Sequence, residues 1–303
     1  MSPFPFISRL KVGPTVLSVG GEAPSVIASP RKFAPFLVSK GGDIEMVVRR
    51  ERGPKPGEVM FESEGVWRVY RQVDGRELWT FRMYGKIYKS VLIDPAIDTG
   101  EIFFPRPKIP GTGRRSALQF PLDEMLFQRR WSRDGLIEVH SCGVVDGGGV
   151  LLFAGQSGAG KSTTARLWNH FEPRRTILSD DRVLLDPREP SQVRAFGTPW
   201  HGTGRFGSTA QAPLRALFFL EQAPRSEAAP LHPAEAAARL LTRTFPPIWD
   251  GLVMERVVRA CAEVTERIPA FVLRFRKDET AIAEARRAAA GDGRGVSVIL
   301  RPL

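Results

Sequence analysis

The first hundred residues contain short runs in which apolar and polar residues alternate, or in which apolar residues follow one another. Turn-forming Gly, Pro and Asp residues separate these runs. Residues 66–70, V-W-R-V-Y, alternate in the way expected of a half-buried strand. The runs that predict strands are 16–19, 45–49, 66–70, 77–83, 87–92 and 102–104. The pattern therefore indicates a β-rich N-terminal region.

A Pro/Gly-rich stretch, 105–115, is the best candidate for a domain boundary, because the pattern changes beyond it. Strand and helix signals then alternate, which is typical of an α/β fold. The predicted helices are 121–130, 162–171, 233–244, 251–268 and one from residue 278. The predicted strands are 136–140, 149–154, 176–185, 193–196, 216–221 and 271–275. We therefore expect a smaller β-rich domain at 1–115 and an α/β domain at 116–303.

Composition narrows the class of protein. The chain has 303 residues, 42% of them hydrophobic, which is enough for packed cores in one large or two modest domains. No apolar run approaches the length of a membrane span, and the first ten residues show no signal peptide. The net charge is +11, but the basic residues are scattered and no nucleic-acid-binding module is recognisable. We rank nucleic acid low as a partner on this basis.

The two cysteines, Cys142 and Cys261, are far apart and have no CxxC partner. This spacing argues against a disulfide framework or a cysteine zinc site and suits a reducing, cytoplasmic setting. Cys261 lies on the apolar stripe of the helix predicted at 251–268, where we interpret it as a core residue.

Residues 155–162 read G-Q-S-G-A-G-K-S, a complete G-x-x-x-x-G-K-[ST] phosphate-binding loop between a predicted strand and a predicted helix. Its glycines allow successive backbone N–H groups to turn toward an anion, and the helix N-terminus adds partial positive charge. Lys161 is positioned for the β- and γ-phosphates, and the Ser162 hydroxyl for Mg²⁺. The predicted nucleotide-binding residues are Gly155, Gln156, Ser157, Gly158, Ala159, Gly160, Lys161, Ser162 and Thr163.

Two adjacent carboxylates, Asp180 and Asp181, follow the short apolar run 177–179. One acid at the end of a neighbouring strand helps to hold Mg²⁺ in a phosphate-loop site, and a second can accept the proton of an attacking hydroxyl. Neighbouring residues of a strand point to opposite faces, so both can face the phosphate only if the strand ends there. A solvated Asp-Asp turn is the alternative interpretation.

Two further groups are candidates for the same site. His140 lies on the strand that precedes the phosphate-loop strand, although a single histidine in a strand is more often a core or edge residue. The turn-rich stretch 196–205 carries Trp200, His201 and Arg205. Loops of this kind often line α/β sites, and Arg205 could neutralise charge on a transferring phosphoryl group. An ordinary connecting loop is the alternative.

Together these motifs resemble the kinase domain of HPr kinase/phosphorylase, a P-loop fold shared in part with phosphoenolpyruvate carboxykinases. The resemblance rests on His140, on V-L-L-F-A-G-Q-S-G-A-G-K-S-T-T-A and on L-S-D-D-R-V, and it covers residues 136–185. The stretch from G-T-P-W-H-G to A-P-L-R-A-L-F-F-L-E is similar to a looser group of HPr-kinase-like proteins. Some of these phosphorylate serine in peptides, including lasso-peptide precursors.

The resemblance implies an ATP-dependent kinase acting on a serine-type hydroxyl of a peptide or protein. Lys161 would bind phosphate, and His140 would lie beside the reacting phosphate. Ser162 and Asp180 would hold Mg²⁺, and Asp181 would be the general base. The N-terminal domain would help to capture the substrate. A homo-oligomer stays open, because relatives in the HPr kinase family are oligomeric.

The chain also departs from that family. The Glu-Arg-Gly signature that follows the Asp pair in HPr kinases is missing, and Thr203 stands where relatives tend to have an acid. We therefore expect a divergent kinase rather than HPr kinase itself. The alternatives are a small-molecule hydroxyl kinase and a nucleotide-binding regulatory module with little catalysis; a carboxykinase-type reaction ranks below these.

Overall fold

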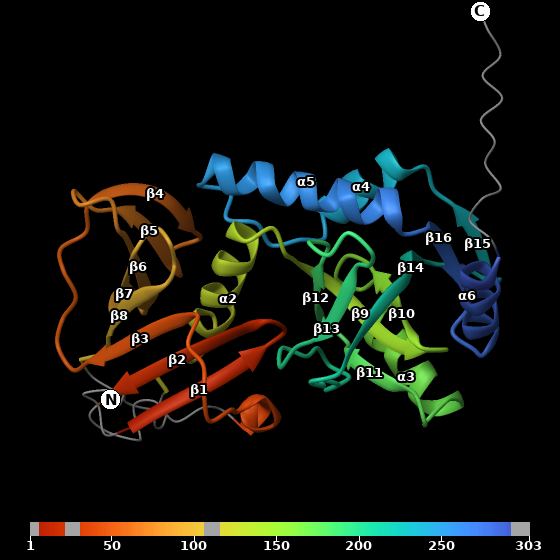
Figure 1. Cartoon of the computed structure of the whole chain (residues 1–303), viewed down its shortest axis with the longest axis horizontal. Coiled ribbons are helices and arrows are strands. Elements are labelled where there is room, and N and C mark those ends of the chain that lie inside the picture. The colour runs from red at the N-terminus through yellow and green to blue at the C-terminus, as the bar shows by residue number, and fades with distance from the viewer. Residues whose placement is uncertain (1–5, 22–30, 106–115, 292–303) are drawn as a thin grey trace, which may run out of the picture. The chain divides into compact units, whose positions relative to one another are not determined.

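The computed structural model of the chain describes residues 6–21, 31–105 and 116–291. The chain divides into two compact units, one formed by Met1–Arg133 with Pro247–Gly251 and the other by Asp134–Pro246 with Leu252–Leu303. Each unit contains one eight-stranded sheet and few helices, so the structure is of the mixed α/β class (Figure 1). The predicted domain boundary was the stretch 105–115, and residues 106–115 of it lie outside the described residues.

The first unit is built on a sheet of mostly antiparallel strands in the order β1-β2-β3-β8-β7-β6-β5-β4. The strands are β1 (Phe6–Val12), β2 (Thr15–Gly21), β3 (Ile44–Arg49), β4 (Glu58–Ser63), β5 (Trp67–Arg71), β6 (Glu77–Met83), β7 (Lys86–Ile93) and β8 (Thr99–Phe103). Among the described strands of this sheet, β2–β3 and β3–β8 are the pairs that run in parallel. The predicted β-rich region is confirmed, while β1, β4 and the short 3-10 helix η1 (Arg31–Phe36) were not predicted.

Helix α2 (Leu122–Arg133) belongs to the first unit, whereas the sequence analysis grouped it with the second domain. Two buried side chains are among those that attach it to the first unit. Trp131 is fully buried and donates from Nε1 to Oγ1 of Thr15 at 3.0 Å. Arg129 is 4% exposed and donates from Nη2 to Glu77 of β6 at 2.6 Å and to Asp250 at 2.7 Å.

The second unit has the sheet order β10-β9-β12-β13-β14-β16-β15, with β11 paired to β9. Because β10 also pairs with β14, strands β10, β9, β12, β13 and β14 close into a ring. The strands are β9 (Ile137–Asp146), β10 (Gly149–Ala154), β11 (Thr176–Ser179), β12 (Arg182–Asp186), β13 (Arg194–Gly197), β14 (Gln211–Gln222), β15 (Glu227–Pro230) and β16 (Ala270–Phe275). The helices are α3 (Lys161–Phe171), α4 (Pro233–Leu241), α5 (Gly251–Arg267) and α6 (Thr280–Ala290).

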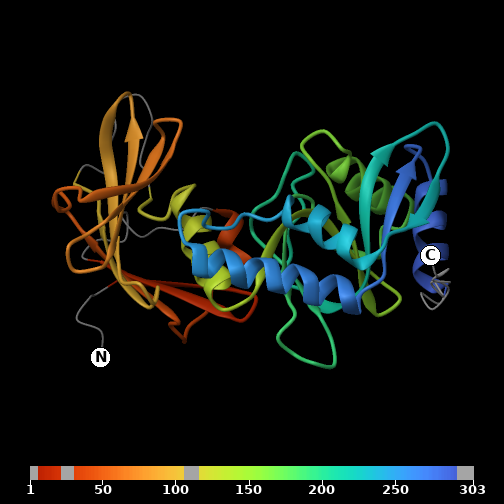
Figure 2. The same ribbon diagram turned by 90° about the horizontal axis from the view of Figure 1, so that it is seen from above.

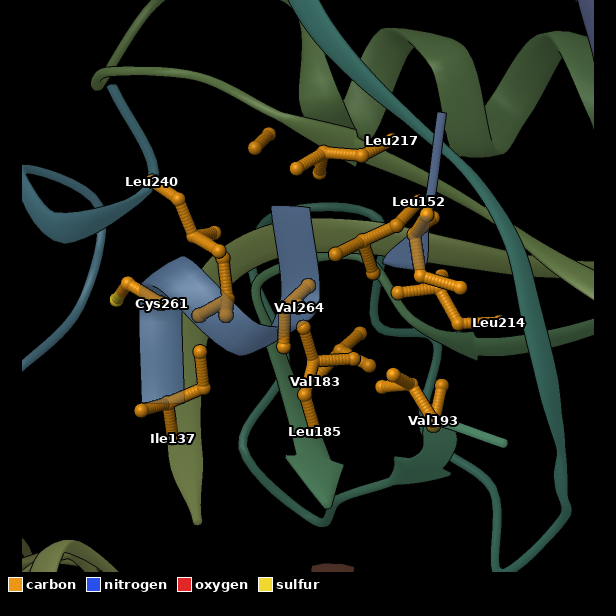
Figure 3. Close-up of a cluster of buried hydrophobic side chains, with 14 of the residues drawn as sticks. Ile137, Leu152, Val183, Leu185, Val193, Leu214, Leu217, Leu240, Cys261 and Val264 are labelled. Atoms are coloured by element: carbon orange, nitrogen blue, oxygen red, sulfur yellow. The ribbon is translucent and has the colours of Figure 1, made fainter. Parts of the chain in front are cut away.

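Helices cover both sides of these strands. Figures 1 and 2 show α4 and α5 side by side, and Figure 1 shows α3 across the strands from them. One core cluster joins α4 and α5 to the strands, and a second joins α3 and α6 to them. In Figure 3, Leu240, Cys261 and Val264 gather with strand residues of the first cluster. Cys261 is 1% exposed, so its predicted role as a core residue is confirmed.

Removal of the Arg286 side chain is expected to destabilise the second unit. Arg286 of α6 donates to both carboxylate oxygens of Asp146, at 2.9 and 3.0 Å, and to Glu172 at 2.6 Å. Asp146 is 6% exposed, so Arg286→Ala leaves a buried carboxylate with only Arg175 as an ion-pair partner. We expect the free energy of unfolding to fall by about 2 kcal/mol, measured by urea denaturation at neutral pH.

The control is Arg287→Ala, which removes the ion pair of an exposed arginine with Glu284 and should change the free energy of unfolding much less. The stability that the Arg286–Asp146 contact contributes should also depend on pH. The hydrogen bonds with Arg286 lower the pKa of Asp146 below its ordinary value of 3.8. The stabilisation is therefore present above about pH 4 and is lost as the pH falls through the lowered pKa. Equal losses in the two variants would contradict this assignment.

In the described part of the chain, every helix is too short or too polar to cross a membrane.

Candidate functional site

The glycine loop joins β10 to α3, in the strand–loop–helix order that the sequence predicted. Gly158 and Gly160 have φ of 81° and 115°, values that residues with a Cβ rarely adopt. Gly160 is the N-cap of α3, so the free N–H groups of the first helical turn begin directly after the loop. The remaining predicted nucleotide-binding residues lie in the loop or in this first turn: Gly155, Gln156, Ser157, Ala159, Lys161, Ser162 and Thr163.

Lys161 is folded back against its own loop. Its Nζ donates to the carbonyl oxygens of Gly155 at 3.0 Å and Gln156 at 2.9 Å, and the residue is only 6% exposed. Burial lowers the pKa of Lys161, although the charge of Asp181 acts in the opposite direction. A poorly solvated ammonium group bound to neutral carbonyls is well placed to interact more strongly with an arriving phosphate.

Asp180 and Asp181 lie in the break between two strands. β11 ends at Ser179 and β12 begins at Arg182, where the sequence had predicted a single strand. The Oγ of Ser179 holds this break in place, because it accepts from the backbone N–H groups of Asp181 and Arg182, both at 3.1 Å. The condition for both carboxylates to reach one site, that the strand ends at the pair, is therefore met.

The carboxylate of Asp180 is enclosed by protein donors. Oδ1 accepts from the backbone N–H groups of Gly202 at 3.0 Å and Phe206 at 3.2 Å. Oδ2 accepts from the backbone N–H of Gly204 at 2.7 Å and from the hydroxyl of Ser162 at 2.7 Å. The residue is fully buried, so the alternative of a solvated Asp-Asp turn is wrong for Asp180.

Asp181 faces a different set of groups. Its Oδ1 lies 3.0 Å from Nε2 of His140, and its Oδ2 accepts from Nη1 of Arg182 at 2.6 Å. Burial raises the pKa of Asp181, but the hydrogen bond with His140 and the charges of Arg182 and Lys161 outweigh burial, so the pKa is lowered. Asp181 is therefore ionised at neutral pH and is able to accept a proton.

The loop that follows β13 lies against the Asp pair, but Arg205 itself is apart from the other predicted groups. Its side chain is exposed, and among the described residues its guanidinium has no hydrogen-bond or ion-pair partner. Arg166 of α3 ties this loop down by donating to the carbonyl oxygen of Thr203 at 3.0 Å and to its hydroxyl at 3.2 Å. His201 is likewise exposed.

The structure adds three residues that the sequence analysis did not assign to the site. The guanidinium of Arg182 stacks over the ring of Phe245, 4.2 Å from its centroid, and the His140 ring lies 5.9 Å from the same ring. The backbone carbonyl of Arg243 accepts from the N–H of His140 at 2.7 Å, and the positive charge of Arg243 lowers the pKa of Lys161. Arg243 and Phe245 follow α4, in a stretch that carries no motif.

The predicted Mg²⁺ ligands fit the ion only in part. The Ser162 hydroxyl donates its hydrogen to Asp180 and keeps oxygen lone pairs that a hard cation accepts. The four acceptor positions of Asp180 are all used by protein donors. In the described residues there is no cluster of three or more His, Cys, Asp or Glu side chains arranged to hold a metal ion.

Comparison with known proteins places this site within a family. The model of the family described as SynChlorMet cassette protein ScmC matches residues 122–278, about half of the chain. The matched segment contains the glycine loop, the Asp pair, His140 and Arg243. No curated protein matches the chain.

Proposed function

The chain belongs to the ScmC family of SynChlorMet cassette proteins, and we propose that it is an ATP-dependent kinase that phosphorylates a serine-type hydroxyl of a peptide or protein. The observation that carries the proposal is the position of Asp181. This ionised carboxylate contacts His140 and lies close enough to Lys161 of the phosphate-binding loop for the Lys161 charge to lower its pKa. A phosphate-binding group and a candidate general base thus belong to one site.

The proposal extends to the fold. We propose that the second unit is a P-loop kinase domain of the HPr kinase/phosphoenolpyruvate carboxykinase type. The glycine loop between β10 and α3, and the Asp pair between β11 and β12, support this assignment. We assign the recognition of the peptide or protein substrate to the β-rich first unit.

The residues divide the reaction between them. The loop amides and Lys161 bind the β- and γ-phosphates, and Lys161 exchanges its bonds to Gly155 and Gln156 for phosphate oxygens. Mg²⁺, held through the Ser162 hydroxyl, would neutralise charge on the β- and γ-phosphates. As the oxygen of the substrate hydroxyl bonds to the γ-phosphorus, Asp181 accepts the proton of that hydroxyl. The bond from that phosphorus to the β,γ-bridging oxygen breaks, and ADP leaves.

Positive charge around Asp181 supports transfer to a hydroxyl. His140 and Arg182 both contact the carboxylate, and the charge of Arg243 also reaches Lys161. The hydrogen bond with His140 and the charges of Arg182 and Lys161 favour the ionised form of Asp181. The arginine and lysine side chains also favour the negative charge that spreads over the transferring phosphoryl group. Arg205, which the sequence placed in this role, would need a different loop or side-chain conformation to take part.

Incubation of the wild-type protein with Mg²⁺, γ-labelled ATP and a lysate of its native host should label a peptide or protein acceptor. Mass spectrometry of the labelled product should locate a phosphoserine. α-Labelled ATP is the control and should label nothing, because the α-phosphate leaves with ADP. Label transferred from the α-position would overturn the proposal.

A second candidate is a nucleotide-binding regulatory module with little catalysis. It is favoured by the closed state of the site, in which Lys161 binds its own loop and Asp180 is fully used by protein donors. Calorimetry, which measures ATP binding, together with mass spectrometry of the products separates the two candidates. Tight binding of ATP without any phosphorylated acceptor or released ADP supports the regulatory module and contradicts the kinase.

A further inference from the structure

We propose that Asp180 is a positioning residue, which locks the loop 200–206 onto Ser162, rather than a direct ligand of the metal ion. The inference rests on the proposed function, because it concerns the phosphate and metal site of that kinase. It departs from the expectation that Asp180 and Ser162 both bind Mg²⁺, and it gives the loop a defined place in the reaction.

Asp180 has few acceptor positions, and protein donors occupy them. A carboxylate offers about four lone-pair sites on its two oxygens. Oδ1 of Asp180 is occupied by Gly202 and Phe206, and Oδ2 by Gly204 and Ser162. A direct bond to Mg²⁺ at about 2.0–2.1 Å would require at least one of these short hydrogen bonds to break.

The backbone of the loop 200–206 closes around the Asp180 carboxylate. Three backbone N–H groups of the loop, from Gly202, Gly204 and Phe206, converge on this one carboxylate. A Cβ added to Gly204 would lie 2.7 Å from Oδ2 of Asp180, and one added to Gly202 would lie 2.9 Å from the same atom. The loop backbone therefore rests directly on the carboxylate, and a side chain at either position would require the carboxylate or the loop to shift.

The same loop also lies against Ser162 and Asp181. The added Cβ of Gly202 would also lie 3.1 Å from Oγ of Ser162 and 3.4 Å from Cβ of Asp181. The loop backbone thus lies directly beside both the Ser162 hydroxyl and the proposed base, Asp181. The hydrogen bonds from Arg166 to Thr203 connect the same loop to α3.

The consequence for Ser162 is directional. Asp180 accepts the hydroxyl hydrogen of Ser162, which leaves the lone pairs of Oγ available for a cation. Asp180 therefore acts through two groups that it holds, the Ser162 hydroxyl and the loop, and it contacts neither metal nor substrate.

Two variants test the inference from opposite sides of the contact. Asp180→Asn places an amide N–H₂ where two donors now point, and Gly204→Ala pushes the loop away while the carboxylate is kept. Asp186→Asn, at the far end of β12, is the control. Hydrogen exchange reports on the amides of Gly202, Gly204 and Phe206, and Mn²⁺ affinity in the presence of ADP is measured by electron paramagnetic resonance.

We expect exchange at these loop amides to rise about tenfold or more in both variants and to stay unchanged in the control. Mn²⁺ affinity should fall by a similar factor in Asp180→Asn and Gly204→Ala, because both variants act through the loop and Ser162. The transfer rate should fall in both. Gly204→Ala keeps the test decisive if Asp180→Asn does not fold.

Three results would overturn the inference. The first is a loss of Mn²⁺ affinity in Asp180→Asn that Gly204→Ala does not share. The second is tighter Mn²⁺ binding in Gly204→Ala, as expected if displacement of the loop frees a metal ligand. The third is loop exchange at the wild-type rate in either variant. If the wild-type protein binds no Mn²⁺ and ADP, the proposed function fails instead, and the exchange data still decide whether Asp180 anchors the loop.

Discussion

Asp181→Asn should lower kcat for phosphoryl transfer by about 10³-fold, because a general base contributes roughly 10²–10⁴-fold in such reactions. The amide keeps the size of the carboxylate and can still contact His140 and Arg182, but it cannot accept the proton of the substrate hydroxyl. Affinity for ADP should stay within about threefold of wild type, since Lys161 and the loop amides bind the phosphates. Single-turnover transfer of labelled phosphate and calorimetry measure the two effects separately.

Asp186→Asn is the matched control, because it makes the same substitution at the opposite end of β12, where Asp186 pairs with Arg188. Its kcat should equal that of the wild type. If Asp181→Asn transfers phosphate at the wild-type rate, Asp181 is not the base. If it loses ADP binding together with transfer, its role is in nucleotide binding.

The pH dependence follows from the same contacts. Burial acts to raise the pKa of Asp181, but the hydrogen bond with His140 and the neighbouring positive charges lower it below 3.8. Asp181 should therefore remain ionised down to about pH 4, and protonation of this carboxylate should reduce kcat only at lower pH. An acid limb near neutral pH would have to arise from another group.

Much of the second unit could be predicted from its sequence, because its strands and helices carry strong periodic signals. The glycine loop is a local motif whose backbone conformation is set by glycines at positive φ, so the motif alone defines strand, loop and helix. The apolar stripe of α5 likewise predicted the burial of Cys261. The assignment of Asp180 and Asp181 to one site depended on a strand ending at the pair, and β11 does end one residue before it.

The remaining features depend on contacts between distant residues. β4 lies at the edge of its sheet with little buried surface, and β15 is a four-residue edge strand that ends in Pro230, so neither has a clear alternating pattern. The enclosure of Asp180 depends on three backbone N–H groups more than twenty residues away, which no side-chain motif records. The contact of Arg243 with His140 is of the same kind, because it uses a backbone carbonyl.

Lys161→Ala should weaken the binding of ADP by about 10²-fold, because a buried point charge on the β-phosphate is removed, and should reduce phosphoryl transfer by about 10³-fold or more, because the γ-phosphate also loses that charge. The larger effect on transfer follows because the charge on the phosphate oxygens is redistributed during the reaction, and Lys161 lies where that charge is bound. Calorimetry with ADP and single-turnover transfer measure the two losses.

Two further variants give this last prediction its specificity. Lys161→Arg keeps the charge but replaces a compact ammonium, bonded to Gly155 and Gln156, with a larger planar group. Lys161→Arg should recover part of the ADP affinity and little of the transfer rate, because the guanidinium group cannot take up the same buried position. Lys86→Ala, which removes an exposed lysine at the start of β7, should leave ADP binding unchanged. Wild-type ADP affinity in Lys161→Ala would show that Lys161 does not bind the phosphates, and the role that the kinase proposal gives it would fail.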